Sequence, residues 1–145
     1  MKGKKVLLTV TGLASNVDED DGAMRLVTTG ILTGTKDKWR LRYTEMQPDT
    51  NEKYRITMTM DKDTVTMNRD GAYGANMVFE QNHRYESSYR TPFGSLDMGI
   101  FPTQVHYHVR EDMSGEVNLK YQLDIQGQYT SFHDLRIRFC ASDPQ

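Results

Sequence analysis

Ser131, His133 and Asp134 stand close together near the C-terminal end of the chain, and they are the residue types of a nucleophilic triad. In such a triad a histidine takes the proton of a serine hydroxyl, while a carboxylate orients the imidazole. The segment alternates with the period of a β-strand, so Ser131 and His133 share one face and Asp134 points to the other. No nucleophile-elbow motif accompanies them. We therefore expect no working triad, and a protein that is not an enzyme.

His106 and His108 lie two residues apart in an extended run, and neutral imidazoles on one face could contribute to a zinc or copper site. Their face is opposite that of Val105, Tyr107 and Val109, which predicts that both histidines meet solvent. Two ligands are too few for a site without further histidines or carboxylates. We expect no metal and no cofactor.

The acidic run from Asp18 to Asp21 carries the carboxylate oxygens that calcium and magnesium prefer. It lacks the spaced ligands and the internal glycine of an EF-hand loop. The pattern favours a solvated loop.

Basic and aromatic residues interleave from Trp39 to Tyr43 and again from Arg84 to Arg90. Proteins that hold single-stranded nucleic acid combine cationic grooves with aromatic stacking platforms. Strict alternation sends the two residue types to opposite faces of a strand, and the sequence has no phosphate-binding loop or dinucleotide fingerprint. We expect no nucleic-acid partner.

The chain has 145 residues and a formal net charge of −2, which predicts one domain spanning residues 1–145. Cys140 is the only cysteine, so no intramolecular disulfide can form, and we expect its side chain to be half-buried. The N-terminal apolar run is short and is interrupted by Thr9, unlike a signal peptide. No apolar run reaches the roughly 20 residues of a membrane-spanning helix. A cytoplasmic protein without a membrane partner is the expectation.

Short runs of alternating apolar and polar residues fill the chain, and residues 116–126 show the pattern most clearly. The stretch Tyr85–Val109 predicts three strands, broken at Thr91-Pro92 and at Phe101-Pro102, and Gly30 predicts a bulge. No segment has a helical period. The sequence predicts an all-β fold, a single antiparallel up-and-down barrel of about 8–11 strands, because closure removes unprotected sheet edges.

The segment from Tyr89 to Ile100, YRTPFGSLDMGI, is the most distinctive in the chain. Together with residues 4–12, 67–71, 77–79, 115–121 and 127–131, it resembles a bacterial YwiB-like family of unknown function. The resemblance covers nearly the whole chain in order. It implies a calycin-like, or lipocalin-like, β-barrel and supplies no established reaction, so no catalytic residues are carried over.

The chain has nine methionines, and Met58, Met60, Met67 and Met98 fall on the expected inner faces of the strands, together with several aromatic residues. Methionine lines adaptable binding surfaces, and a barrel of about eight strands either packs solid or holds one small ligand. We expect a non-enzymatic barrel that binds a small, largely apolar ligand. The alternative is a protein-interaction module with a packed interior, and the oligomeric state stays open. The expected ligand-binding residues are Trp39, Tyr43, Met58, Arg69, Tyr89, Met98 and Tyr121.

Overall fold

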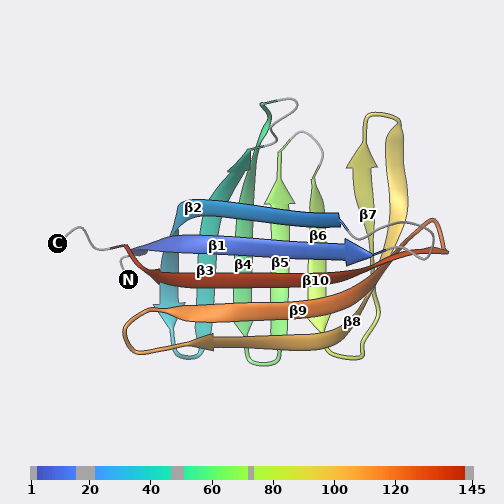
Figure 1. The fold of residues 1–145 in the computed structure, drawn as a ribbon. Coiled ribbons are helices and arrows are strands. Elements are labelled where there is room, and N and C mark those ends of the chain that lie inside the picture. Colours follow the sequence, from blue (N-terminus) through green and yellow to red (C-terminus); the bar gives the residue numbers. More distant parts are fainter. Residues whose placement is uncertain (1–2, 16–21, 47–50, 72–73, 143–145) are drawn as a thin grey trace.

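A computed structural model describes residues 3–15, 22–46, 51–71 and 74–142, without the side chains of residues 22, 23, 89, 129 and 130. Its secondary structure consists of ten strands (Figure 1). These are β1 (Lys4–Ser15), β2 (Gly22–Thr35), β3 (Lys38–Met46), β4 (Lys53–Asp61), β5 (Thr64–Asp70), β6 (Ala75–Glu80), β7 (Tyr85–Thr91), β8 (Gly94–Val109), β9 (Gly115–Ile125) and β10 (Gln128–Ala141). The acidic run from Asp18 to Asp21 lies outside the described residues.

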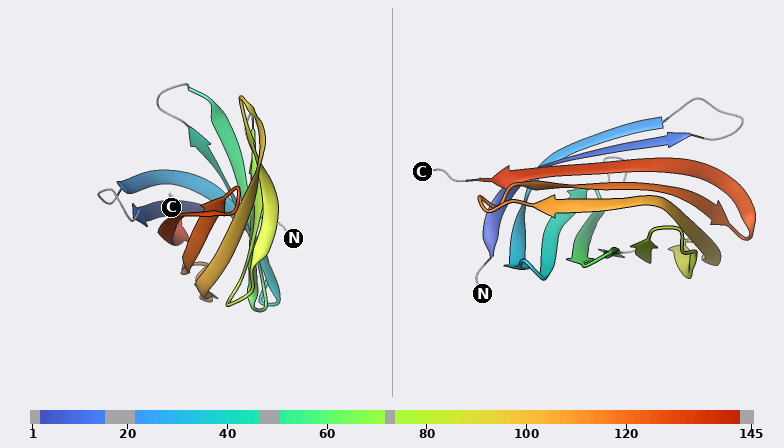
Figure 2. Two further views of the ribbon diagram at one scale, coloured as in Figure 1. Left: turned by 90° about the vertical axis from the view of Figure 1, so that its right-hand side faces the viewer. Right: turned by 90° about the horizontal axis from the view of Figure 1, so that it is seen from below.

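All ten strands belong to one antiparallel sheet in the order β6-β5-β4-β3-β2-β1-β10-β9-β8-β7. Strands β3–β6 form one layer, and β1, β9, β10 and the first part of β2 cross over it as a second layer (Figures 1 and 2). Consecutive strands pair with each other except β6 and β7, which are the two ends of the sheet, and a ladder between β1 and β10 joins the two halves. This confirms the predicted up-and-down barrel, which is nearly closed.

The seam between β6 and the β7–β8 hairpin brings the two ends of the sheet together. The Asn82 N–H, in the turn after β6, donates to the Pro102 carbonyl of β8 at 2.8 Å, and the Arg90 N–H of β7 donates to the Gly74 carbonyl beside β6 at 3.5 Å. The Asn76 amide also donates to the Tyr85 hydroxyl at 3.3 Å. These few contacts replace the continuous ladder of a fully closed barrel.

Period-two patterning places the core between the layers. On β1, Val6, Leu8 and Val10 face inward and are almost fully buried, whereas Leu7 on the opposite face is 43% exposed. The corresponding inward side chains of β3–β6 and β8–β10 complete one apolar cluster. The two layers therefore depend on each other for burial.

The central stretch differs from its prediction. Residues 94–109 form the continuous strand β8, so the break expected at Phe101-Pro102 is wrong. Pro102 lies in the strand, where the register with β9 shifts between Pro102 and Gln104. An irregularity in the ladder accommodates a residue that has no N–H to donate, without ending the strand.

Gly30 marks the point where β3 leaves β2. Strand β3 pairs with β2 only from Gly30 to Thr35, whereas β1 pairs with β2 on both sides of that glycine. The register is unshifted at Gly30, so the bulge predicted there is wrong. A Cβ atom at this position would collide with the Arg42 carbonyl oxygen and would lie 2.9 Å from Leu8 Cδ1. Glycine is needed here for close approach of the backbones.

We predict that Gly30→Ala destabilises the protein by about 1–3 kcal/mol, because the new methyl group overpacks the contact between β2 and β3. Gly12→Ala is the matched control, because a Cβ there would meet Met24 and Leu135 only at 3.6 and 4.0 Å. Urea unfolding measures both variants. Equal unfolding free energies for the two variants would contradict this role of Gly30.

Candidate functional site

The inward face of β1 changes character along its length. Bulky residues occupy its first part, whereas the last two inward positions are Gly12 and Ala14. In the ladders, Gly12 lies opposite Met24 on β2 and Leu135 on β10, and Ala14 lies opposite His133. These small residues between larger neighbours leave space on the inner surface beside the C-terminal end of β1.

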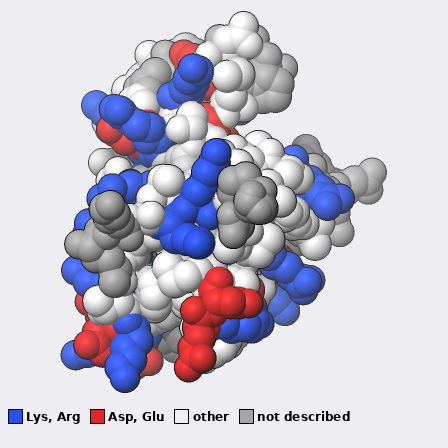
Figure 3. Space-filling view, turned by 90° about the vertical axis from the view of Figure 1, so that its left-hand side faces the viewer, with Lys and Arg blue, Asp and Glu red and all other residues white. Residues whose placement is uncertain are grey.

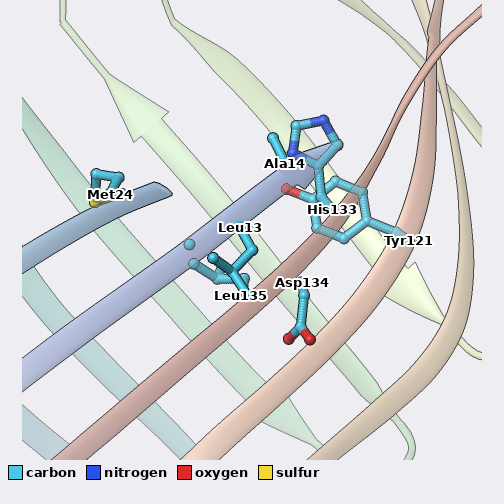
Figure 4. Close-up of a pocket in the computed structure, with 8 residues that line it drawn as sticks. Leu13, Ala14, Met24, Tyr121, His133, Asp134 and Leu135 are labelled. Carbon is cyan, nitrogen blue, oxygen red and sulfur yellow. The ribbon is translucent and has the colours of Figure 1, made fainter. Parts of the chain in front are cut away.

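A pocket of about 370 Å³ occupies this space (Figure 4). Met24, at the β2 side, is 45% exposed although it faces inward, because β3 does not extend alongside this part of β2. The pocket therefore lies next to the apolar core and opens to solvent where β3 is absent beside β2. Its lining residues are Gly12, Leu13, Ala14, Met24, Tyr121, His133, Asp134 and Leu135.

Ser131, His133 and Tyr121 form a polar cluster at one end of the pocket. The Ser131 hydroxyl and His133 Nε2 are 2.6 Å apart, and Ser131 is buried. The Tyr121 ring stacks on His133 with centroids 5.0 Å apart, and the same tyrosine meets Phe79 of the other layer edge-to-face. Neighbours on both sides therefore fix the positions of the imidazole and the phenol.

Burial keeps both ring groups neutral. Loss of solvent lowers the pKa of His133 below its ordinary 6.5 and raises the pKa of Tyr121 to about 12. A neutral imidazole offers one donor and one acceptor, and a phenol hydroxyl can both donate and accept. The cluster can therefore hydrogen-bond an uncharged polar group, and it provides no formal charge of its own.

The geometry separates the residues of the suspected triad. Ser131 and His133 share a face as predicted, while Asp134 binds Arg136 through two contacts of 3.2 Å. Figure 4 shows the Asp134 carboxylate directed away from the His133 ring. The observed pair is a serine–histidine hydrogen bond without the carboxylate that orients the imidazole in a triad.

The seven residues expected to bind the ligand occupy several environments. Tyr43, Met58 and Met98 are buried in the packed core, and Trp39 packs against it half-buried. Of the six whose side chains the structure describes, only Tyr121 lines the pocket beside β1. The ligand role of the others stays a prediction, and the Tyr89 side chain is outside the described part of the structure.

Arg69 faces inward on β5 and is half-buried, with its guanidinium 3.8 Å from the centre of the Tyr54 ring. Its Nε atom is also 3.9 Å from Glu45 Oε1. Arg69 therefore already has an aromatic and an acidic neighbour, and it does not line the pocket described above.

Sequence reasoning missed Gly12, Ala14, Met24 and Leu135 as pocket residues, because it looked for large side chains on inner faces. A usable signal was present. Once Val6, Leu8 and Val10 define the inward face of β1, the next two inward positions are small. A change from large to small along one face indicates a hollow.

His106 and His108 are both exposed, as the alternation predicted. Across the described residues, no group of three or more histidine, cysteine, aspartate or glutamate side chains is placed to hold a metal ion. Cys140 is exposed, and the prediction that it is half-buried is wrong. It lies opposite Leu7 on the outer face of the β1–β10 ladder.

The sequence model of a family described as a domain of unknown function, DUF1934, matches residues 8–137. The chain belongs to the DUF1934 family. The match includes every residue that lines the pocket. No curated protein matches this DUF1934 chain.

A similar fold has been observed in a crystal structure. The chain is similar to the crystal structure of the YwiB protein from Bacillus subtilis, with a TM-score of 0.85 and 20% identity over 99% of this chain and 95% of that chain. This likeness establishes the fold and confirms the YwiB-like resemblance seen in the sequence. The described residues include no helix that is both long and apolar enough to cross a membrane.

The buried imidazole predicts a pH dependence of stability. The unfolded chain binds a proton near pH 6.5, whereas folded His133 binds it only at lower pH. The unfolded state therefore holds more protons in this window, and stability falls as the pH drops below about 6.5. We expect His133→Gln to lose less stability between about pH 7 and 5 than the wild type, measured by urea unfolding.

His108→Gln is the control, because it removes an exposed histidine from β8 and should leave the wild-type profile in place. If His133→Gln and the wild type lose stability equally over this range, the assigned burial of His133 is wrong.

Proposed function

We propose that this DUF1934 barrel binds a small, largely apolar molecule that carries one uncharged hydrogen-bonding group. The observation that carries the proposal is the pocket of about 370 Å³ beside Gly12 and Ala14, with the polar cluster at one end. Small-molecule pockets commonly measure about 300–1,000 Å³ and combine apolar walls with a few placed polar groups.

The lining supports this class of ligand. Met24 and Leu135 provide apolar walls, and Figure 4 places His133 and Tyr121 side by side at one end. Because both rings are neutral at pH 7, a charged ligand group would enter without a counter-charge there, which costs free energy. An alcohol, ketone or amide group fits the cluster better than a carboxylate.

The proposal assigns binding and no catalysis. Ser131 is only 5% exposed, so its hydroxyl is poorly placed to attack a substrate. Asp134, engaged with Arg136, does not orient His133. In this role the serine holds the imidazole in one orientation through its hydrogen bond.

We propose that the protein is bacterial and cytoplasmic, and that its barrel binds the ligand in the interior, as a lipocalin does. The bacterial source of the similar YwiB structure supports the bacterial origin. A single cysteine whose side chain is exposed suits a reducing compartment. A ligand between the layers of an up-and-down barrel is the arrangement typical of lipocalins.

Native mass spectrometry of protein purified from its own organism tests whether a ligand is bound. We expect a mass above that of the 145-residue chain, with the excess lost on denaturation. The mass difference then gives the size of the bound molecule. A bare chain mass under gentle conditions would contradict a resident ligand.

The pocket itself is tested with N-phenyl-1-naphthylamine, an uncharged fluorescent probe with a single N–H group. We predict that Ala14→Leu weakens probe binding by at least about tenfold, because the added carbons fill the pocket. Thr11→Leu is the matched control on the outward face of β1 and should bind as the wild type does.

Gly12→Val fills the same pocket from the neighbouring inward position and replaces Ala14→Leu if that variant unfolds. Circular dichroism establishes that each variant is folded. Undiminished probe binding by a folded, pocket-filled variant would show that the site lies elsewhere.

A further inference from the structure

Among the described residues, half of β2 pairs with a strand on one side only. Gly22 pairs with Ala14 of β1, and this ladder continues to Leu32, but β3 begins to pair with β2 only at Gly30. Within the described chain, Gly22–Thr29 therefore has no strand on its side away from β1. We call this side the free β2 edge. Figure 2 (left) shows β2 and the β3–β4 hairpin diverging.

An edge of this kind presents backbone N–H and C=O groups that can pair with another extended chain. Natural barrels protect such edges by closure, prolines, bulges or a covering segment. The free β2 edge carries no proline, and its register with β1 is regular throughout. It is long enough for an eight-residue strand.

A second pocket lies at the end of the free β2 edge, where β3 departs, and we call it the fork pocket. Its volume is about 340 Å³, and it lies beside Thr29, Ile31 and Thr44. Lys5, Arg42 and Arg55 also line it, and none of its described lining residues is acidic. The fork pocket is thus positively charged in a chain whose formal net charge is −2.

These cations have few ionic partners in the part of the chain that the structure describes. Among the described residues, neither Lys5 nor Arg42 forms an ion pair. Arg55 lies 3.6 Å from Asp70, but their side chains are 81% and 63% exposed, and such pairs contribute little. Arg25, on the same outward face of β2, is exposed as well. Figure 3, which views the left-hand side of Figure 1, shows more basic than acidic side chains on that face.

The two faces of the free β2 edge differ in chemistry. Arg25 and Thr29 point outward, on the same face as the fork pocket. Met24 and Leu26 point toward the interior, and Met24 is 45% exposed because no strand covers this edge in the described chain. A strand added to this edge alternates its own side chains in the same way. Acidic side chains on its outward face would meet the cations, and apolar side chains on its inward face would cover Met24 and Leu26.

We propose that the free β2 edge binds an extended segment of a partner protein in which acidic and apolar residues alternate. Backbone hydrogen bonds to β2 provide the affinity, and the fork pocket selects negative charge. A second copy of this chain fits less well, because two such edges would bring Arg25 and the fork cations of both copies together. Nucleic acid fits less well. Trp39 packs against the core, and Tyr43, which also lines the fork pocket, is only 7% exposed, so neither ring offers a stacking platform.

The test uses the full chain and the fluorescein-labelled peptide acetyl-(Glu-Val)4-amide, with binding followed by fluorescence anisotropy. We expect saturable binding that weakens with added salt, and slower amide hydrogen exchange in residues 22–29. The same peptide N-methylated at every residue, and acetyl-(Lys-Val)4-amide, should both fail to bind.

Arg42→Glu should weaken binding of the acidic peptide by roughly tenfold or more, because it places like charges together in the fork pocket. Arg90→Glu, an exposed site on β7, makes the same change in net charge and should bind as the wild type does. Arg25→Glu provides a second reversal if Arg42→Glu is unfolded. Ala14→Leu should keep peptide binding, which separates this proposal from the interior ligand.

Three outcomes would overturn the proposal. The first is the absence of saturable peptide binding, and the second is equal binding of the N-methylated peptide. The third is protection of residues 22–29 that rises with protein concentration in the absence of peptide, which would assign the edge to a second copy of the chain.

Discussion

The ladder between β1 and β10 holds the two halves of this protein together. It runs in unbroken register from Val6 opposite Ala141 to Ser15 opposite Phe132. Strands β1–β6 form one meander and β7–β10 another, and this is the only continuous ladder between them in the described chain. Antiparallel pairing directs partner residues to the same face, so the ladder also decides which side chains meet in the interior. The pocket depends on it directly, since Ala14 belongs to one meander and His133 to the other.

Burial has different consequences at the two ends of the barrel. Where Val6, Leu8 and Val10 face the opposite layer, apolar side chains fill the space between the layers. Where Gly12 and Ala14 take their place, polar residues enter the wall. Ser131 and His133 satisfy each other there through a hydrogen bond of 2.6 Å, as a polar group removed from water requires. The same burial that stabilises the core therefore produces neutral hydrogen-bonding groups at the pocket.

The separation of β3 from β2 creates two surfaces with different properties. On the inner side it exposes Met24 and opens the pocket to solvent. On the outer side it exposes the β2 edge and gathers Lys5, Arg42 and Arg55 around the fork. Gly30 lies at the branch point, and its missing side chain lets the two strands approach before they part. One local feature of the backbone thus underlies both the interior ligand site and the proposed strand-binding site.

The sequence by itself determined the strands and their inward faces, because a period of two along a strand is a local property that needs no knowledge of the partner. It predicted the antiparallel barrel, the opposite faces of Ser131 and Asp134, and the exposure of His106 and His108. Only the tertiary structure decided which inner faces meet. Met58 and Met98 share the inward pattern with Tyr121, yet they lie in solid packing, while the opening forms beside the smallest inward residues of β1. Pairing β1 with β10 brings together residues more than a hundred positions apart, and no local period carries that information.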